Sequence, residues 1–553
     1  MQLSNNKNKS DYLIILIVIC FLTIPFIGKS FHIDDYIYSY GAKQILTDPL
    51  KPLGGYQNLF GQIMPTYHFT QHPPIISYYI SLVEIITGKL EESNLHLAFL
   101  FFSFLAFLAI YFFASRFFQH PLYISLLIIS TPAFLVMAHN VMTEIAFLAF
   151  YFTSLSAFIY GIDKRKLSFL LLSSFSLIAT CFIQYRGLIL LPILFLYSFL
   201  TQKNFWKFFY LLLPAPILFI LWSLLNFYDY GVIHFLDAWG WIEFKPERLL
   251  QNTVSYLSFL GGGTIFPLFS IFVTRKGFDR KFQVLAIAIA TLLVVGFYLK
   301  SYPTSEQLLF VLFFITGCFL FVYAIPSLSN PLIFLRPDNE IGSANVKPKE
   351  DLFLLTLLII PFLSQIILNL FASVRSLLII FPILIVMAFR KMELSNLYKP
   401  SGIKKLLIIG IALTLFSGIT VSIADWQYAN CYRETAGIVK KYQQPHNRIF
   451  FSGEWGFRYY MEKNGYKYLL TNDNSAQPGD IIIIPSIPCP SPLHPDLLAR
   501  LKIIDTIIYN SKFPIRVMNG GAHAGFYSDG WGLLPYSFST VPLETFKIYQ
   551  VER

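Results

Sequence analysis

Hydrophobic residues occur along this chain in long runs of roughly 16 to 24 positions, separated by short polar segments. A helix of that length crosses the ~30 Å hydrocarbon core of a bilayer. The pattern therefore predicts about thirteen membrane-spanning helices, with edges good to about three residues. The predicted spans are 12–28, 95–117, 121–138, 145–162, 167–183, 187–200, 207–228, 252–273, 282–299, 308–327, 352–371, 376–389 and 406–424.

A fourteenth apolar run, 75–87, is short and contains Glu84. If this run crossed the membrane, downstream basic clusters such as 164–166 would move to the outside, against the positive-inside rule. We therefore expect 75–87 to lie along the interface as a partly buried helix. Thirteen spans then place the N-terminus in the cytoplasm and the C-terminus outside.

Two regions outside the spans are long enough to fold. The first is 29–94, a first extracytoplasmic loop with juxtamembrane helices. It belongs to the transmembrane domain, which is expected to comprise residues 1–425. The tail, 426–553, combines an Ile-rich stretch at 480–485 with a helix-like segment at 455–463. This pattern is typical of a small α/β domain. The predicted fold class is a polytopic α-helical membrane protein with a small C-terminal extracytoplasmic α/β domain.

The composition supports this assignment. The chain is 55% hydrophobic and 13% charged, whereas soluble domains contain about 25% charged residues, so a soluble globular domain is excluded. The net charge of +11 is no sign of nucleic-acid binding, because Lys and Arg flank the apolar runs as topology signals do. Cys431 and Cys489 share the outer domain, and whether they pair in an oxidising compartment stays open.

The predicted spans carry no ionisable group near their middle. Ion-coupled carriers need such groups along their path, which weighs against a proton-driven or sodium-driven transporter. Carboxylates and cations gather instead at the outer ends of the spans. A lipid headgroup would lie at this level of the membrane.

Asp34 and Asp35 follow the first span beside aromatic residues that include Tyr38. A carboxylate held there is suited to deprotonate or orient an acceptor hydroxyl. The competing interpretation is that the two acids are solvated caps of the next helix.

His72 and Glu144 stand in the first and second outer loops. His72, in Gln71-His72-Pro73-Pro74, opens the interfacial helix and is either a plain loop residue or a ligand for a phosphate or a divalent metal. Glu144 lies in a tight turn between two apolar spans, where burial in the bilayer would cost ~2–3 kcal/mol. Its alternative role is to interact with a helix N-terminus.

Cations occupy the same outer face. They are Arg186, Lys245, Arg248, Lys300 and Arg375. Each alone is most simply an interface anchor. Arg375, between two apolar spans, is placed to neutralise a lipid phosphate as it leaves a reaction centre.

These residues, in this order, resemble the glycosyltransferase C (GT-C) superfamily. The nearest resemblance is to bacterial family-39-type enzymes related to lipid A aminoarabinose transferase and protein O-mannosyltransferases. The pattern is an acidic pair and Tyr after the first span, Lys- or His-Pro-Pro, an acid in the second outer loop, and a late basic residue. This chain matches it with Asp34-Asp35-x-x-Tyr38, His72-Pro73-Pro74, Glu144 and Arg375.

The resemblance covers roughly 1–425, with departures. Asp35 stands where the family commonly has Glu, and Glu144 where Asp is frequent. Gln71-His72 replaces the Glu-Lys of the aminoarabinose enzyme.

The resemblance implies a polyprenyl-phosphate sugar as donor, with its lipid held in a groove between spans. The sugar would pass, with inversion, to a lipid, glycan or protein acceptor at the outer face of the cytoplasmic membrane. Asp34 would be the base, supported by Asp35 and Glu144. No cofactor beyond the donor is implied with certainty, and a divalent metal at His72 stays open. The candidate substrate-binding residues are Tyr38, His72, Arg186, Lys245, Arg248 and Arg375.

Two other interpretations remain at this stage. A lipid-linked sugar flippase or exporter would perform no chemistry, but it predicts polar groups along a path through the spans. An O-antigen ligase or polymerase typically carries its chemistry on a large late outer loop, whereas the late loops here are short. The segment 453–460 is either a strand-to-helix turn or part of an acceptor site.

Overall fold

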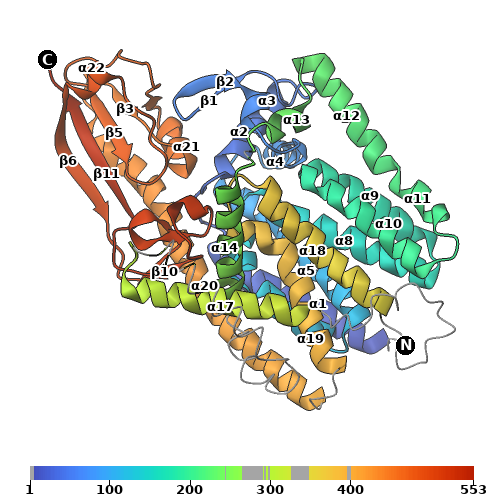
Figure 1. Ribbon diagram of the computed structural model, residues 1–553. Helices are drawn as coiled ribbons and strands as arrows, with labels where there is room; N and C mark the ends of the chain where they lie inside the picture. The colour runs from blue at the N-terminus through green and yellow to red at the C-terminus, as the bar shows by residue number, and fades with distance from the viewer. Residues whose placement is uncertain are drawn as a thin grey trace.

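The computed structural model describes residues 5–242, 244–264, 301–325, 348–394 and 400–553, with four single positions between 264 and 301. Within these residues, long helices form a bundle. The strands of the C-terminal region form a separate sheet beside one end of it (Figure 1). The short helices and the hairpin of the first loop gather at that same end.

Seven helices in the described residues are long and apolar enough to cross a membrane, and a pair bent by 68° forms an eighth candidate. The chain is therefore a multi-pass membrane protein. The seven are α1 (Asn5–Thr23), α5 (Glu92–Phe117), α8 (Thr143–Lys164), α11 (Trp206–Leu212) continued by α12 (Pro214–Tyr230), α17 (Thr304–Ala324), α18 (Pro348–Leu368) and α20 (Pro400–Ile438). The bent pair is α6 (Pro121–Ile129) and α7 (Pro132–Ala138).

The predicted count of about thirteen is not confirmed. The expected spans 167–183, 187–200 and 376–389 correspond to α9 (Leu167–Ile183), α10 (Leu190–Thr201) and α19 (Ile380–Leu394), which are shorter than the seven. A 3-10 helix precedes both α10 and α19, so these α-helices begin later than the predicted spans, whereas α9 has the predicted bounds. The span 252–273 is described only as far as α14 (Pro246–Gly263), and most of 282–299, like Lys300, lies outside the described residues.

The predicted interfacial helix is present as α4 (Ile75–Thr87). One face packs inward through Ile76, Ile80 and Val83, while Leu82 and Ile86 on another face are more than half exposed. An exposed apolar face of this kind suits a helix that lies against lipid.

The C-terminal region contains a five-stranded sheet in the order β4-β3-β5-β11-β6. Strand β3 (Ile449–Phe451) pairs in parallel with β4 (Lys467–Tyr468) and β5 (Ile481–Pro485). Strand β11 (Glu544–Val551) runs antiparallel between β5 and β6 (Leu501–Tyr509). Helix α21 (Trp455–Lys463) follows β3. The Ile-rich stretch at 480–485 forms β5 and the segment 455–463 forms α21, so the expected strand and helix are both confirmed.

The membrane bundle and the C-terminal region are continuous. Helix α20 extends across the predicted boundary at 425 without a break and contacts both α7 and α21. Cys431, on this helix, and Cys489 are both free thiols.

The first loop folds into α2 (Asp35–Thr47), a hairpin of β1 (Tyr56–Leu59) and β2 (Gln62–Pro65), and α3 (Thr66–Phe69). Figure 1 shows these elements between α21 and α13 (His234–Trp239). The first loop therefore bridges the C-terminal region and the membrane helices.

Candidate active site

Two adjoining cavities open where the first loop meets the helix ends. We call the first the basic chamber, a cavity of about 420 Å³ lined by Arg186, Arg375, Asn369 and Glu144 among others. The second, the aromatic chamber, has about 330 Å³. It is lined by residues that include Asp34, Tyr38, Trp455 and Trp531. The two share part of their lining, namely Gln71, His72, Trp241, Leu370, Phe371 and Arg375.

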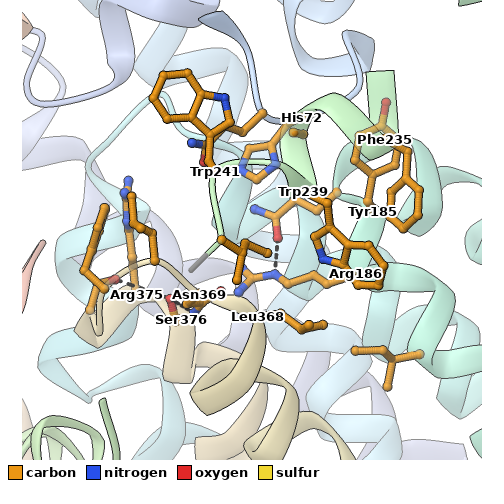
Figure 2. Close-up of a pocket in the computed structure, with 18 of the residues that line it drawn as sticks. His72, Tyr185, Arg186, Phe235, Trp239, Trp241, Leu368, Asn369, Arg375 and Ser376 are labelled. Carbon is orange, nitrogen blue, oxygen red and sulfur yellow. Dashed lines mark hydrogen bonds between the residues drawn. The ribbon is translucent and has the colours of Figure 1, made fainter. Parts of the chain in front are cut away.

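The two arginines of the basic chamber come from equivalent local structures. Arg186 is the second residue of the 3-10 helix η2 (Tyr185–Ile189), and Arg375 is the second residue of η6 (Val374–Ile379). Each 3-10 helix follows an extended residue, Gln184 or Ser373, and leads directly into the next helix. These breaks hold both cations at the end of the bundle, where Figure 2 shows them in one pocket.

Arg186 is fixed by neutral partners. Its Nε donates to Gln184 Oε1 and its Nη1 donates to Gln365 Oε1 at 2.9 Å, while its guanidinium lies 4.9 Å from the centre of the Phe147 ring. No carboxylate pairs with Arg186 in the described residues within salt-bridge distance. Its charge is therefore available to an anion in the chamber.

Arg375 lies between two carboxylates. Its Nη1 donates to Asp34 Oδ2 at 2.5 Å, and its Nε lies 3.7 Å from Glu144 Oε1. Although burial opposes it, the charges of these two acids raise the pKa of Arg375. The second Glu144 oxygen, Oε2, is buried and has no hydrogen-bond partner within the described residues. Asp34, Glu144 and Arg375 are thus brought together as the order of the motifs predicts.

Asp35 faces away from both chambers. It is fully buried, and its two oxygens accept hydrogen bonds from the backbone nitrogens of His32 and Val141, both at 2.8 Å. Burial raises the pKa of Asp35 to about 7, against the opposing charge of Lys29. Asp35 therefore bridges the first and second outer loops, and the described lining of the two chambers does not include it.

Tyr38 and His72 both line the chambers. Tyr38 lies one helical turn after Asp34, and its hydroxyl is 3.4 Å from Thr143 Oγ1. Burial, with the charges of Arg186 and Arg375, lowers the pKa of His72 to about 3, so the imidazole is neutral near pH 7. A neutral imidazole retains one N–H to donate to a phosphate oxygen.

The surroundings of His72 do not fit a divalent metal. The charged groups that shift its pKa include two arginines. Within the described residues there is no group of three or more His, Cys, Asp or Glu side chains placed to hold a metal ion. The structure thus offers His72 anion-binding neighbours rather than metal ligands.

The described lining of the two chambers does not include Lys245 or Arg248. Lys245 is the residue before α14. Arg248, in the first turn of α14, donates to the carbonyl oxygens of Ile367 and Asn369 at the end of α18. It therefore satisfies a helix C-terminus and holds Asn369, which lines the basic chamber, in place.

Helix α13 covers the basic chamber through Trp239. It is held to the first loop by His68 Nδ1, 2.8 Å from Asp237 Oδ2, and by His234 Nε2, 2.7 Å from the Thr70 carbonyl. The Tyr185 hydroxyl contacts the other nitrogen of His234 at 2.5 Å.

The C-terminal region supports the site through residues that sequence reasoning missed. The backbone nitrogen of Val374 donates to the Phe526 carbonyl at 2.9 Å, and Asp529 Oδ1 accepts from the Ala372 nitrogen at 3.1 Å. These contacts flank Arg375. Only the fold brings them together.

A buried polar network lies behind Asp34. Lys29 Nζ is paired with Asp425 on α20 and donates to Asn140 Oδ1 at 2.5 Å. The hydroxyl of Tyr527 donates to the other Asp425 oxygen at 2.9 Å. The sequence contains a signal for this pair. Lys29 directly follows the first predicted span and Asp425 directly follows the last, so both are expected at the outer ends of helices.

Together, fold and site define a class: a polytopic membrane protein with a charged, two-chambered cavity at one end of its helix bundle. Comparison with family models gives no match, and no curated protein matches the chain. Comparison with solved structures does find similar chains.

The oligosaccharyltransferase of Archaeoglobus fulgidus, in complex with Zn and sulfate, is 14% identical with a TM-score of 0.46. The similarity covers 82% of this chain and 62% of that one, so the chain spans less than two thirds of its length. ArnT from Cupriavidus metallidurans in the apo state is 13% identical, covers 91% of this chain and 97% of its own, and has a TM-score of 0.43.

The arabinofuranosyltransferase AftD from Mycobacteria is 12% identical with a TM-score of 0.44. The similarity covers 100% of this chain and 40% of the arabinofuranosyltransferase. Two of these three structures are transferases by name, an oligosaccharyltransferase and an arabinofuranosyltransferase.

Proposed function

We propose that the protein is a membrane glycosyltransferase. It moves a sugar from a polyprenyl-phosphate-linked donor to an acceptor at the outer face of the cytoplasmic membrane, with inversion. The observation that carries this proposal is the contact between Asp34 and Arg375 at the wall shared by the two chambers. In this contact Asp34 is the base for the acceptor, and Arg375 is the cation that stabilises the leaving phosphate.

The basic chamber suits the three parts of such a donor. Leu188 and Phe235 offer apolar surface to the first prenyl units. Arg186 and Arg375 supply the positive charge that a phosphodiester needs. The unpartnered oxygen of Glu144 is placed to accept a hydrogen bond from a sugar hydroxyl.

The same residues suit the chemical step. The acceptor oxygen attacks the anomeric carbon from the side of the aromatic chamber while the bond from that carbon to the phosphate oxygen breaks. Asp34 takes the acceptor proton. The electron pair of the broken bond leaves on polyprenyl phosphate, where Arg375 and Arg186 stabilise the charge. The transition state has oxocarbenium character, as in other glycosyl transfer.

Arg375 also couples donor binding in the basic chamber to the charge of Asp34 in the aromatic chamber. A donor phosphate that binds Arg375 competes with Asp34 for the same guanidinium. Binding of the donor thereby loosens the Asp34 contact and leaves that carboxylate able to accept a proton.

The proposal is tested with purified protein in detergent and synthetic polyprenyl-phosphate sugars, by following the release of free polyprenyl phosphate. We expect release by the wild type and a loss of about 10²–10⁴-fold in Asp34→Asn, the range for removal of a general base. Asp48→Asn is the matched control, because Asp48 ends α2 and the described lining of the chambers does not include it.

Absence of release with every donor, combined with donor binding that raises the melting temperature, would overturn the proposal. It would favour a flippase or exporter instead.

A further inference from the structure

We propose that the aromatic chamber binds the acceptor as a saccharide, stacked on tryptophans that the C-terminal region contributes. This inference deepens the proposed function and rests on it. It concerns the chamber that Asp34 lines, whereas the donor phosphate is assigned to the basic chamber.

Tryptophans are concentrated in this chamber. Three of the seven in the chain, Trp241, Trp455 and Trp531, are among its lining residues, with Phe60 and Phe371 beside them. The C–H groups of a sugar ring form an apolar face with partial positive charge, and the face of an aromatic ring is partially negative. Aromatic walls are therefore suited to stack against sugar rings.

Trp455 is positioned by hydrogen bonds that its neighbours Glu454 and Arg458 form with the first loop. Its backbone is in the left-handed region (φ 63°), which is strained for a residue with a side chain. The neighbouring Glu454 is fully buried and accepts from the Phe60 nitrogen at 2.9 Å and the Tyr36 hydroxyl at 3.1 Å. Arg458, one turn later, donates to the Asn58 carbonyl at 2.5 Å.

The hydrogen bonds of Glu454 and Arg458 give the segment 453–460 a structural role. The segment is a strand-to-helix turn, as expected, but its charged residues bind the first-loop hairpin and its tryptophan lines the chamber. These contacts hold the backbone on either side of Trp455 in place. Local strain of this kind occurs preferentially at functional sites.

Trp531 comes from a second rigid turn, η9 (Asp529–Trp531). Its ring lies 6.1 Å from that of Trp455 in an edge-to-face arrangement. The turn is fixed to the membrane helices, since Asp529 Oδ2 accepts from Ser255 Oγ at 2.9 Å. The two rings are therefore held at an interplanar angle of 69° in the wall of the chamber.

Polar groups that line the same chamber suit hydroxyls. The indole nitrogen of Trp241 is buried and has no hydrogen-bond partner within the described residues. Asp34 and Gln71 also line this chamber. A sugar supplies both the hydroxyl oxygen that Trp241 lacks and the hydroxyl proton that a carboxylate accepts.

Other acceptors fit the chamber less well. Arg375 is the single Lys or Arg in its described lining and is assigned to the donor phosphate, so an anionic lipid headgroup bound at the same time would lack a counter-charge. A peptide that binds by strand addition is recognised through a row of backbone hydrogen bonds along a strand edge. The described lining consists largely of aromatic and aliphatic side chains instead.

The experiment uses the full-length protein in detergent with two readouts. The first is transfer, measured with a donor that the wild type cleaves, to methyl glycosides of glucose, galactose, mannose, arabinose and N-acetylglucosamine. The second is binding of the same glycosides without donor, measured by saturation-transfer-difference NMR. A short Ser/Thr peptide and phosphatidylglycerol serve as the rival acceptors.

We expect at least one glycoside to bind and to accelerate release of polyprenyl phosphate. Trp531→Ala should raise the KM for that glycoside about tenfold, the effect of losing one stacking contact, and change the donor KM much less. Trp531→Phe should recover most of the affinity, which also shows that the fold survives. Trp206→Ala is the control, since Trp206 is an exposed residue of α11.

Acceleration by the peptide or the phospholipid, with no effect from any glycoside, would overturn the inference while leaving the transferase proposal intact. Glycoside binding that needs Trp531, without transfer from any donor, would overturn the transferase proposal and retain the saccharide site. Failure of every glycoside to bind would overturn the saccharide site itself.

Discussion

The Asp34 carboxylate accepts a hydrogen bond of 2.5 Å from Arg375 across 341 positions of the sequence. The pair joins the start of α2 to the 3-10 helix η6 and forms part of the wall between the basic and aromatic chambers. Both groups are largely buried, with exposed side-chain fractions of 24% and 14%. Their interaction is therefore screened less by water than that of a surface pair.

Arg375→Lys should lower the rate of polyprenyl phosphate release at saturating donor by about 10²–10³-fold. Lysine keeps the charge but lacks the planar fork that lets Arg375 reach both Asp34 and Glu144. Release is measured under the conditions used for the wild type, with Arg500→Lys as a control on the C-terminal region. More than half of the wild-type rate in Arg375→Lys would contradict the assigned role.

Asp35 should make stability fall as the pH rises. Its pKa is about 7 in the folded protein and near 4 when exposed, so the folded state holds the proton more tightly between these values. Stability is then lost from about pH 4 to about pH 7 and levels off above. We expect the melting temperature of Asp35→Asn to change less over this range than that of the wild type. Parallel curves for the two proteins would show that Asp35 does not titrate there.

His72 should act as a neutral hydrogen-bond donor. Because its pKa is about 3, His72→Gln should lower the release rate without changing the shape of the pH–rate profile between pH 5 and 8. Treatment with EDTA should leave the rate unchanged, since His72 has arginines rather than metal ligands beside it. A loss of activity in EDTA that a divalent cation restores would instead support a metal at this position.

The buried Lys29–Asp425 pair should be needed for stability. Both side chains are 1% exposed, and removing one partner leaves the other charge buried, at a cost of about 3–5 kcal/mol. Lys29→Met and Asp425→Leu should each lower the melting temperature, and the double variant should recover much of the loss. A double variant that loses as much as the two single variants combined would indicate no coupling between the residues.

Hydrophobic periodicity by itself determined much of this protein. The length of the apolar runs predicted a multi-pass membrane protein, and the seven helices long enough to span confirm it. Helix 75–87 and the segments at 455–463 and 481–485 were also predicted, because each has a local pattern that does not depend on distant partners. The shared site of Asp34, Glu144 and Arg375 was predicted differently, from the family resemblance that these residues carry in their order along the chain.

The tertiary structure decided the rest. Asp34 and Asp35 are adjacent and chemically alike, yet one lines a chamber and the other bridges two loops, because α2 begins between them and turns their side chains apart. Arg248 and Arg375 were both candidate substrate-binding residues, but Arg248 donates to carbonyl groups at the end of α18, whereas Arg375 pairs with Asp34 in the chamber wall. Burial and long-range pairing assign these roles, and neither is encoded in the spacing of residues along the chain.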